Sequence, residues 1–429
     1  MKRKKRINIK KVILFLILPI MVIGAIVFFT VDKSVKEKNQ EKAKIALKKD
    51  IKNHYSEYVV TSKQTKLYDK DENVIGEVGK GVTLSLEKIK NVSENDKYFL
   101  TKDFEDTYVI YHDVEPGEEV TYDDRYKKYI PFNENIVTNE KVTFYDEDGE
   151  IVYTLPKSYD LPIIIKDGER YGVEFKDRLL YVKKDDVKET KESSNTDRSN
   201  ASGVAVLNYH FFYDPANPDD AGCNEIICAS KSQFQSHIDY FKEHDIFTIK
   251  MHELELYMDG KLQLPKSVLI TIDDGARTKL AVDMLTENKM NGTIFLVTAW
   301  YNPKEYYVTD YIELHSHSHN LHDGGECPGG QGGGIKCLDR DYILDDLKQT
   351  RELLNNTTAF CYPFYEYNSY SEELLKEAGF TMAFIGEEYA WYGPYKLAEV
   401  GGDKMKIPRF VVVTYTTISE FDRYFNEIR

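Results

Sequence analysis

The stretch SVLITIDDGARTKLAVDMLTENKMNGTIFLVT, residues 267–298, decides the fold class of the C-terminal half of the chain. It begins with a β-branched apolar run typical of a buried strand, continues with a helical pattern, and ends in a second apolar strand. Strand, helix and strand in this order predict a βαβ unit in a parallel sheet. The first strand ends in two adjacent carboxylates, Asp273 and Asp274, for which packing alone gives no reason.

The same alternation continues from Gly203 to Arg429. The further expected strands are VAVLNYH, IFTI, AFCYP, MAFIG and IPRFVVVT, and the helices include SQFQSHIDYFKEHD, DYILDDLKQTRELLNN and SEELLKEAGF. Repeated βα units of this kind predict an α/β fold, a (β/α) barrel that is incomplete, over residues 203–429.

Two similar stretches precede this domain: KLYDKDENVIGEVGKGVTLSL from Lys66 and TFYDEDGEIVYTLPKSYDLPI from Thr143. Both combine an aromatic-Asp pair, a polar turn and short alternating strands, and they resemble small bacterial SH3-like β domains. We expect one such domain at residues 58–115 and a second at 130–187, followed by a polar linker at 188–202. Such domains could bind cell-wall polymer or serve only as a spacer, and the sequence leaves both open.

The N-terminus has the composition of a membrane anchor. Residues 1–11 carry seven basic and no acidic residues, whereas residues 12–31 carry no charge and are long enough to cross a bilayer as a helix. An uncleaved anchor is favoured over a signal peptide, with residues 1–11 cytoplasmic, a helical stalk at 32–57 and the C-terminal body outside the cell. The net charge of −15 argues against a nucleic-acid partner.

Titratable side chains stand where several predicted strands end. In parallel barrels these ends meet at one face, which is where active sites lie. The candidates are His210, Asp273 and Asp274, the histidines of HSHSHNLH, the Pro363-Phe364 pair, and Arg409 at the start of the last strand.

Two carboxylates and a histidine cluster match the ligand chemistry of a divalent metal. One Asp and two His can bind Zn²⁺ and leave a position for water. The neighbouring Asp points away on an extended strand and is free to act as a base. If ELHSHSH is a strand, His315, His317 and His319 share one of its faces, whereas His322 follows in a loop, so spacing alone leaves the choice of ligands open.

TIDDG, SHSHNLH, YPFYEYN and LNYH together resemble the motifs of NodB-type polysaccharide deacetylases (carbohydrate esterase family 4), in the branch that acts on poly-N-acetylglucosamine. The resemblance covers about Val204–Arg429. It implies a metal-dependent N-deacetylase, with Zn²⁺ as the first choice of metal and acetylated polysaccharide as substrate.

The resemblance also implies roles for individual residues. Asp273 is expected to be the base, and Asp274, His317 and His322 to hold the metal. The third motif, Pro363, Phe364 and Tyr365, is expected to supply the oxyanion-hole N–H near Phe364 and contacts to substrate, and His210 is expected to be the general acid.

Two positions depart from the family pattern. Cys361 stands where most members have an Arg that accompanies the base, and a C-terminal LxxH-type acid is not apparent after Ile407. We expect Arg409 to supply the cation from another strand and His210 to replace the acid.

Aromatic residues near the motifs could stack on sugar rings, with Tyr301, Tyr365 and Trp391 preferred. Cysteines outside the membrane can form disulfides, for which the short loops Cys223/Cys228 and Cys327/Cys337 are suited. Cys361 would remain as a buried thiol.

Two alternative functions stay open. The same machinery could hydrolyse O-acetyl esters, or the domain could be a decayed enzyme that only binds the cell wall. Peptidoglycan is the near rival of poly-N-acetylglucosamine as substrate.

Overall fold

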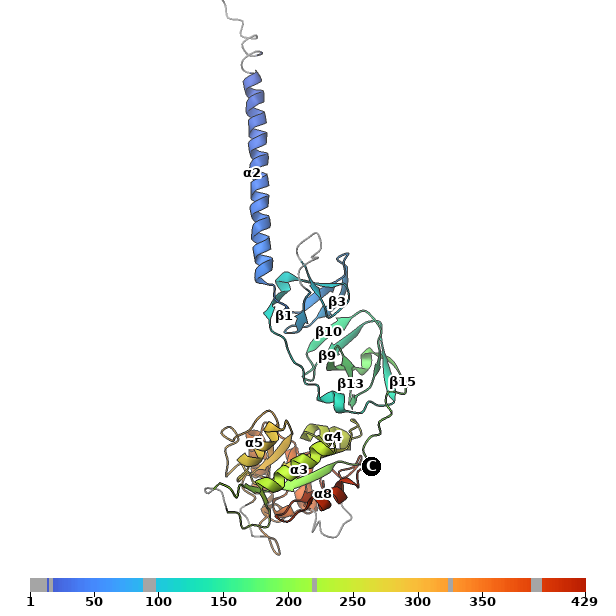
Figure 1. Ribbon diagram of the computed structural model, residues 1–429, viewed down its shortest axis with the longest axis vertical. Coiled ribbons are helices and arrows are strands. Elements are labelled where there is room, and N and C mark those ends of the chain that lie inside the picture. The colour runs from blue at the N-terminus through green and yellow to red at the C-terminus, as the bar shows by residue number, and fades with distance from the viewer. Residues whose placement is uncertain (1–13, 15–17, 88–97, 218–221, 323–326, 387–395) are drawn as a thin grey trace, which may run out of the picture. The chain divides into compact units, whose positions relative to one another are not determined.

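The structure is a computed structural model that describes Leu14 and residues 18–87, 98–217, 222–322, 327–386 and 396–429 (Figure 1). The chain divides into two compact units. One comprises Met1–Tyr122 with Glu140–Ser158, and the other comprises Asp123–Asn139 with Tyr159–Arg429.

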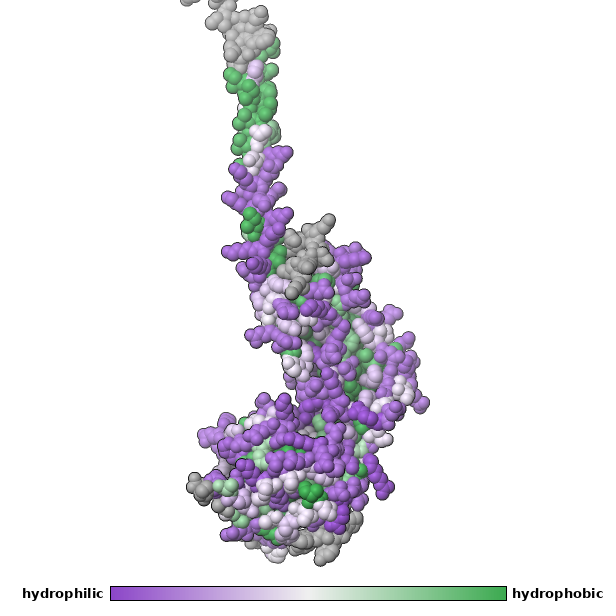
Figure 2. Space-filling model, in the orientation of Figure 1, coloured by the Kyte–Doolittle hydropathy of each residue, from purple (hydrophilic) through white to green (hydrophobic). Residues whose placement is uncertain are grey.

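The first unit begins with one long helix, α2 (Leu18–Asn53). Its apolar first part is exposed and is long enough to cross a membrane, and a signal sequence has the same properties. Figure 2 shows apolar side chains on this part and hydrophilic ones on the rest. Residues 12, 13 and 15–17 of the predicted span lie outside the described residues, and the predicted stalk is helical as far as Asn53.

The rest of the first unit is antiparallel. Its strands are β1 (Tyr58–Thr61), β2 (Thr65–Tyr68), β3 (Val74–Val78), β4 (Thr83–Ser85), β5 (Tyr98–Thr101), β6 (Thr107–Ile110), β7 (Val114–Gly117), β9 (Val142–Tyr145) and β10 (Ile151–Leu155). Strand β10 pairs with β3, so the hairpin β9–β10 belongs to the same unit as the first predicted repeat. The predicted boundaries 58–115 and 130–187 therefore do not coincide with two separate units, and the SH3-like class stays a prediction.

The second unit begins with a small β region. Its strands are β8 (Glu134–Thr138), β11 (Asp160–Pro162), β12 (Ile165–Asp167), β13 (Arg170–Phe175), β14 (Arg178–Lys183) and β15 (Val187–Glu192). Strand β15 pairs with β8. The first residues of the predicted linker at 188–202 therefore belong to a strand, and the prediction is wrong for this part. Farther along, the Asn195 amide donates to the Phe132 carbonyl and Arg198 to the Tyr129 carbonyl, because polar side chains can replace missing backbone partners.

The large domain is built on one parallel sheet. Its strands are β16 (Ala205–Tyr209), β19 (Phe247–Thr248), β20 (Ser267–Ile272), β21 (Gly292–Leu296), β22 (Ile312–Ser316), β23 (Ala359–Cys361), β24 (Met382–Phe384) and β25 (Phe410–Val411). They lie in the order β24-β23-β22-β21-β20-β16-β25, with β19 beside β20. All residues of β16, β20 and β21 are buried, as expected for strands covered on both faces.

The sheet curls until its ends nearly meet. Ile407 forms a parallel bridge with Phe384 of β24, and three residues later Phe410 pairs with Leu207 of β16. The short segment 407–411 thus spans from one edge strand to the other. The predicted curled, barrel-like parallel sheet is confirmed in the described part of the chain.

Helices cover the outside of this sheet (Figure 1). They are α3 (Lys231–Glu243), α4 (Met251–Met258), α5 (Lys279–Glu287), α6 (Arg340–Leu353), α7 (Ser369–Ala378) and α8 (Ile418–Phe425). Phe234, Ile238 and Phe241 of α3 pack with Phe421 of α8 in one core cluster. The helices bury the outer face of the sheet, so polar groups gather at the strand ends.

Candidate active site

The two adjacent carboxylates lie in a sharp turn at the end of β20. Asp274 has a φ of 70° and Gly275 a φ of 92°, and the Gly275 N–H donates to the Asp273 carbonyl at 2.8 Å. A Cβ on Gly275 would lie 2.4 Å from Leu296 Cδ1, so only glycine fits here without displacing Leu296. The turn directs the two carboxylates to different partners.

Asp274 meets two of the four candidate histidines. Its Oδ1 lies 3.3 Å from His317 Nε2 and 3.2 Å from His322 Nε2. These three ligand atoms lie within 4.8 Å of one another, and Asp274 and His317 are buried. The structure thus brings together the three residues expected to hold a metal.

The hydrogen bonding of His317 suits a metal ligand. Its Nδ1 lies 2.9 Å from the Cys361 carbonyl, which only a protonated Nδ1 can use, so Nε2 faces Asp274. Although burial opposes it, the pKa of His317 is raised by the nearby Cys361, Asp274 and Asp273 groups. A cation between Nε2 and Asp274 would take the place of this added proton, so the residues fit a divalent metal.

The other two candidate histidines form hydrogen bonds away from Asp274. His315 Nδ1 lies 2.6 Å from Thr357 Oγ1, and burial lowers the His315 pKa to about 4. His319 Nδ1 contacts Thr298 Oγ1, and its backbone N–H donates to Asp346. Asp346, on helix α6, also accepts from the Asn320 N–H and so holds the loop between the two site histidines.

Asp273 is paired with Arg409. The guanidinium donates from Nη1 to Oδ1 at 2.8 Å and from Nη2 to Oδ2 at 2.9 Å, and both side chains are buried. Burial raises the pKa of Asp273, but the charge and hydrogen bonds of Arg409 together with the nearby His317 and His210 outweigh burial, so that the pKa lies below its usual value. Thr271 Oγ1 and the Ile385 carbonyl also accept hydrogen bonds from Arg409. Asp273 is therefore held as a carboxylate.

Cys361 lies between these groups as a free thiol. Its Sγ is 3.1 Å from Arg409 Nη2 and 3.4 Å from Asp273 Oδ2. Asp273, His317 and Cys361 could form a second metal-binding set that shares His317. Burial raises the pKa of Cys361, and both oxygens of Asp273 are engaged by Arg409, so the Asp274 set fits a metal better.

His210 lies beside the same carboxylate. Its Nε2 is 3.9 Å from Asp273 Oδ2, which is close but beyond hydrogen-bond distance. Burial lowers the pKa of His210 despite the opposing effect of Asp273 and Asp274. Its Nδ1 is buried and has no protein partner among the described residues.

The third motif forms a tight turn at the end of β23. Phe364 and Tyr365 have φ values of 55° and 58°, directly after Pro363 in η6 (Pro363–Tyr365). The Tyr365 hydroxyl donates to Asn208 Oδ1 at 2.6 Å, which links this turn to strand β16. Phe364 is exposed and its ring lies 4.5 Å from the His322 ring.

Trp300 lies at the site, although the sequence analysis did not prefer it as a sugar-stacking residue. Its ring lies 4.8 Å from His322 and is 41% exposed, so Trp300 and Phe364 flank this imidazole. Tyr301 instead packs against the core beside Tyr306, and Trp391 lies outside the described residues. The position of Trp300 shortly after β21 was the available signal. Nothing in the sequence pattern marked Asp346.

Residues 261–383 match the polysaccharide deacetylase family. A protein from Staphylococcus aureus (strain MSSA476) named poly-beta-1,6-N-acetyl-D-glucosamine N-deacetylase is 29% identical over 182 residues, which cover 38% of this chain and 62% of that protein. The protein of the same name from Staphylococcus epidermidis is 27% identical over 260 residues, covering 53% of this chain and 86% of that protein. The chain thus spans less than two thirds of the length of the S. aureus relative.

Solved structures are also similar. A de-N-acetylase from Aggregatibacter actinomycetemcomitans shares 17% identity and covers 52% of this chain and 99% of its own, with a TM-score of 0.42. IcaB from Ammonifex degensii shares 19% identity and covers 53% and 97%, with a TM-score of 0.41.

The family match places the C-terminal domain in a class of hydrolases that act on acetylated carbohydrate. The matched residues 261–383 thus form a polysaccharide deacetylase domain. The matched segment contains Asp273, Asp274, His317, His322 and the third motif, whereas His210 and Arg409 lie outside it.

Proposed function

We propose that this chain is a metal-dependent N-deacetylase that removes acetyl groups from N-acetylglucosamine residues of a surface polysaccharide, either poly-N-acetylglucosamine or peptidoglycan. The observation that carries the proposal is that the two neighbouring carboxylates have different partners. Asp274 converges with His317 and His322, while Asp273 is held as a carboxylate by Arg409.

Asp274, His317 and His322 would hold the metal, for which Zn²⁺ is our first choice because its ligands are commonly imidazole and carboxylate. When bound, such an ion supplies Lewis-acid polarisation of water and of the acetamide carbonyl. Asp273 takes the proton of the attacking water as general base. The backbone N–H near Phe364 donates to the oxyanion that forms on the substrate, and such a donor contributes about 3–4 kcal/mol.

Asp273 and His210 would act as a pair during amine release. The low pKa of His210 leaves it neutral at rest, so it must first gain a proton before it can donate one. The proton taken by Asp273 is held on a carboxylate whose Oδ2 lies 3.9 Å from His210 Nε2, so a small movement of His210 would bring the two into hydrogen-bond contact for direct transfer. His210 then protonates the departing amine, which is a poor leaving group without that proton.

The N-terminal half would hold the catalytic domain at the cell surface. The apolar part of α2 would span the membrane with the seven basic residues cytoplasmic and the C-terminal domain extracellular. The β regions would bind cell-wall polymer or act as a spacer. Protease treatment of intact cells tests this topology, because an extracellular catalytic domain is cleaved without lysis.

Acetate release from β-1,6-linked N-acetylglucosamine oligomers, chitooligosaccharide, peptidoglycan and acetylxylan, each with and without a chelator, tests the function. We expect chelator-sensitive release from an N-acetylated glycan. Release from acetylxylan alone would support the O-acetyl esterase, and no release from any substrate would support a protein that only binds the cell wall.

A further inference from the structure

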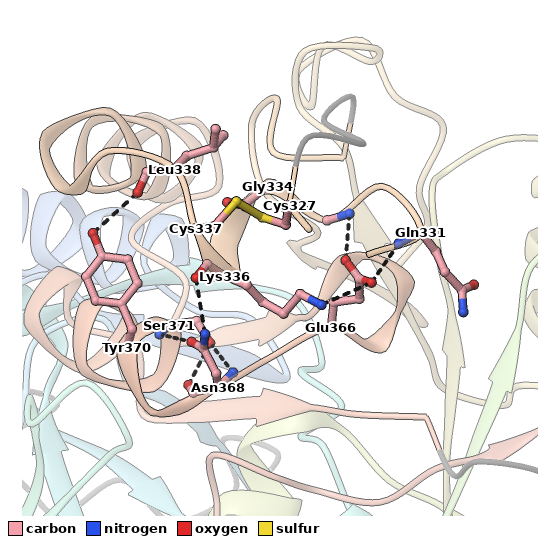
Figure 3. The surroundings of a disulfide bond; sticks show 11 residues. Cys327, Gln331, Gly334, Lys336, Cys337, Leu338, Glu366, Asn368, Tyr370 and Ser371 are labelled. Atoms are coloured by element: carbon pink, nitrogen blue, oxygen red, sulfur yellow. Dashed lines mark hydrogen bonds and ion pairs between the residues drawn. A yellow bond between two sulfur atoms is a disulfide. The ribbon is translucent and has the colours of Figure 1, made fainter. Parts of the chain in front are cut away.

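A disulfide-closed, glycine-rich loop lies beside the third motif (Figure 3). The loop, residues 327–337 with the sequence CPGGQGGGIKC, is closed by Cys327 and Cys337. Glu366 binds it at several points, since its carboxylate accepts the Gln331 N–H at 2.7 Å and the Gly333 N–H at 3.0 Å. Lys336 from the same loop lies 3.2 Å from Glu366 Oε1.

The glycine-rich loop reaches His322 by two routes. The Gly334 N–H donates to the carbonyl of Leu321, the residue before His322, at 3.1 Å. The Gly332 backbone packs against one side of the Phe364 ring. This ring in turn packs against the His322 imidazole, with the two ring centroids 4.5 Å apart. His317 is oriented by a hydrogen bond to Cys361, whereas His322 is flanked by rings.

Glycine is required for the second route. Gly332 has a φ of 151°, and a Cβ there would lie 2.3 Å from Phe364 Cε2 and 2.5 Å from Cζ. An alanine would push the Phe364 ring away and change its contact with His322. Gly329 in the same loop offers a control, because it also has a positive φ of 73° but has no atom within 4 Å of its Cβ position.

We infer that the glycine-rich loop is a brace that positions His322 for metal binding, with Gly332 and Glu366 as positioning residues. The inference rests on the metal site of the proposed function. A consequence is that the Cys327–Cys337 disulfide supports metal affinity. The closed loop has fewer conformations than an open one, so placing Gly332 and Gly334 against Phe364 and Leu321 costs less conformational entropy. Residues that orient a ligand typically affect metal affinity by about 10–100-fold.

The first experiment compares Gly332→Ala with Gly329→Ala in the full chain. The Zn²⁺ dissociation constant is measured by competition with a chromogenic chelator, and folding is checked by circular dichroism. We expect Gly332→Ala to weaken Zn²⁺ binding about 10-fold or more, and Gly329→Ala to bind like the wild type. Equal affinity in both folded variants overturns the inference.

A second experiment covers the case in which Gly332→Ala fails to fold. Glu366→Gln keeps the size of the side chain but loses the charge that pairs with Lys336, and Cys327→Ser/Cys337→Ser opens the loop. Both should weaken Zn²⁺ binding, whereas Cys223→Ser/Cys228→Ser, which opens the other disulfide, should not. Wild-type affinity in both loop variants overturns the inference.

These measurements remain informative if the proposed function fails. A wild-type protein that binds Zn²⁺ but releases no acetate contradicts the proposed deacetylase activity. The Zn²⁺ affinities of the loop variants still test whether the loop positions His322. A wild-type protein that binds no Zn²⁺ overturns the brace as well.

Discussion

Arg409 donates two hydrogen bonds to the two carboxylate oxygens of Asp273, although 136 residues separate them along the chain. The pair depends on the strand order, because Arg409 directly precedes β25, which lies next to β16, which is itself adjacent to β20. Cys361, where the resemblance led us to expect an Arg, contacts both residues. The guanidinium thus reaches the carboxylate from a different strand.

Removing Arg409 should alter the acid limb of the pH–rate profile. Arg409 holds the pKa of Asp273 low against the effect of burial, so in Arg409→Met burial should raise that pKa. The base would then be protonated at a higher pH, and the acid limb of kcat/KM should move to higher pH. An unchanged profile in a folded Arg409→Met protein would show that Arg409 does not tune the base.

The same substitution should also destabilise the fold. Loss of one partner of a buried ion pair costs about 3–5 kcal/mol. Arg409→Lys is the matched control, since it keeps the charge but loses the two-pronged contact, and urea unfolding of both variants compares them.

The metal ligands should differ sharply from the other histidines. Asp274→Asn, His317→Gln and His322→Gln should each lose metal affinity and at least about 100-fold in kcat/KM, because each removes a ligand or its charge. His319→Gln is the control, as His319 contacts Thr298 rather than Asp274. Isothermal titration with Zn²⁺ and acetate release measure both effects, and equal losses in all four variants would contradict the assignment.

His210 should matter more for amides than for esters. An amine must be protonated to leave, whereas an alkoxide needs less help, so His210→Ala should reduce N-deacetylation about 10²–10⁴-fold and ester hydrolysis much less. The comparison uses p-nitrophenyl acetate and an N-acetylglucosamine oligomer. Unimpaired N-deacetylation would assign the acid to another group.

Placing an Arg at position 361 should fail unless Arg409 is removed. Cys361 Sγ lies 3.1 Å from Arg409 Nη2, so Cys361→Arg would force two guanidinium groups into one buried space. We expect Cys361→Arg to be inactive and destabilised, and Cys361→Arg/Arg409→Leu to recover part of the activity. A double variant no better than either single variant would show that the two positions cannot exchange roles.

Local patterns were sufficient to predict the parallel sheet and the strand ends that carry polar groups. Apolar β-branched runs such as SVLITI are typical of central strands, and the carboxyl ends of parallel strands share one edge, so Asp273, Asp274 and the histidine cluster were expected near one another. The resemblance to NodB-type polysaccharide deacetylases, rather than spacing alone, then implied Asp274, His317 and His322 as the ligands. Both short disulfide loops could be anticipated from cysteine spacing and are present.

Only the tertiary structure decided which side chains touch. The pairing of Arg409 with Asp273, the Cys361 carbonyl behind His317 and the loop 327–337 behind Phe364 all join segments that are distant in the chain. Hydrophobic periodicity assigns a residue to a face, but contacts across strands depend on strand order and on how far the sheet curls. For the same reason the sequence did not predict the pairing of β10 with β3. It showed two similar stretches but not that the hairpin of the second would pair with strands of the first.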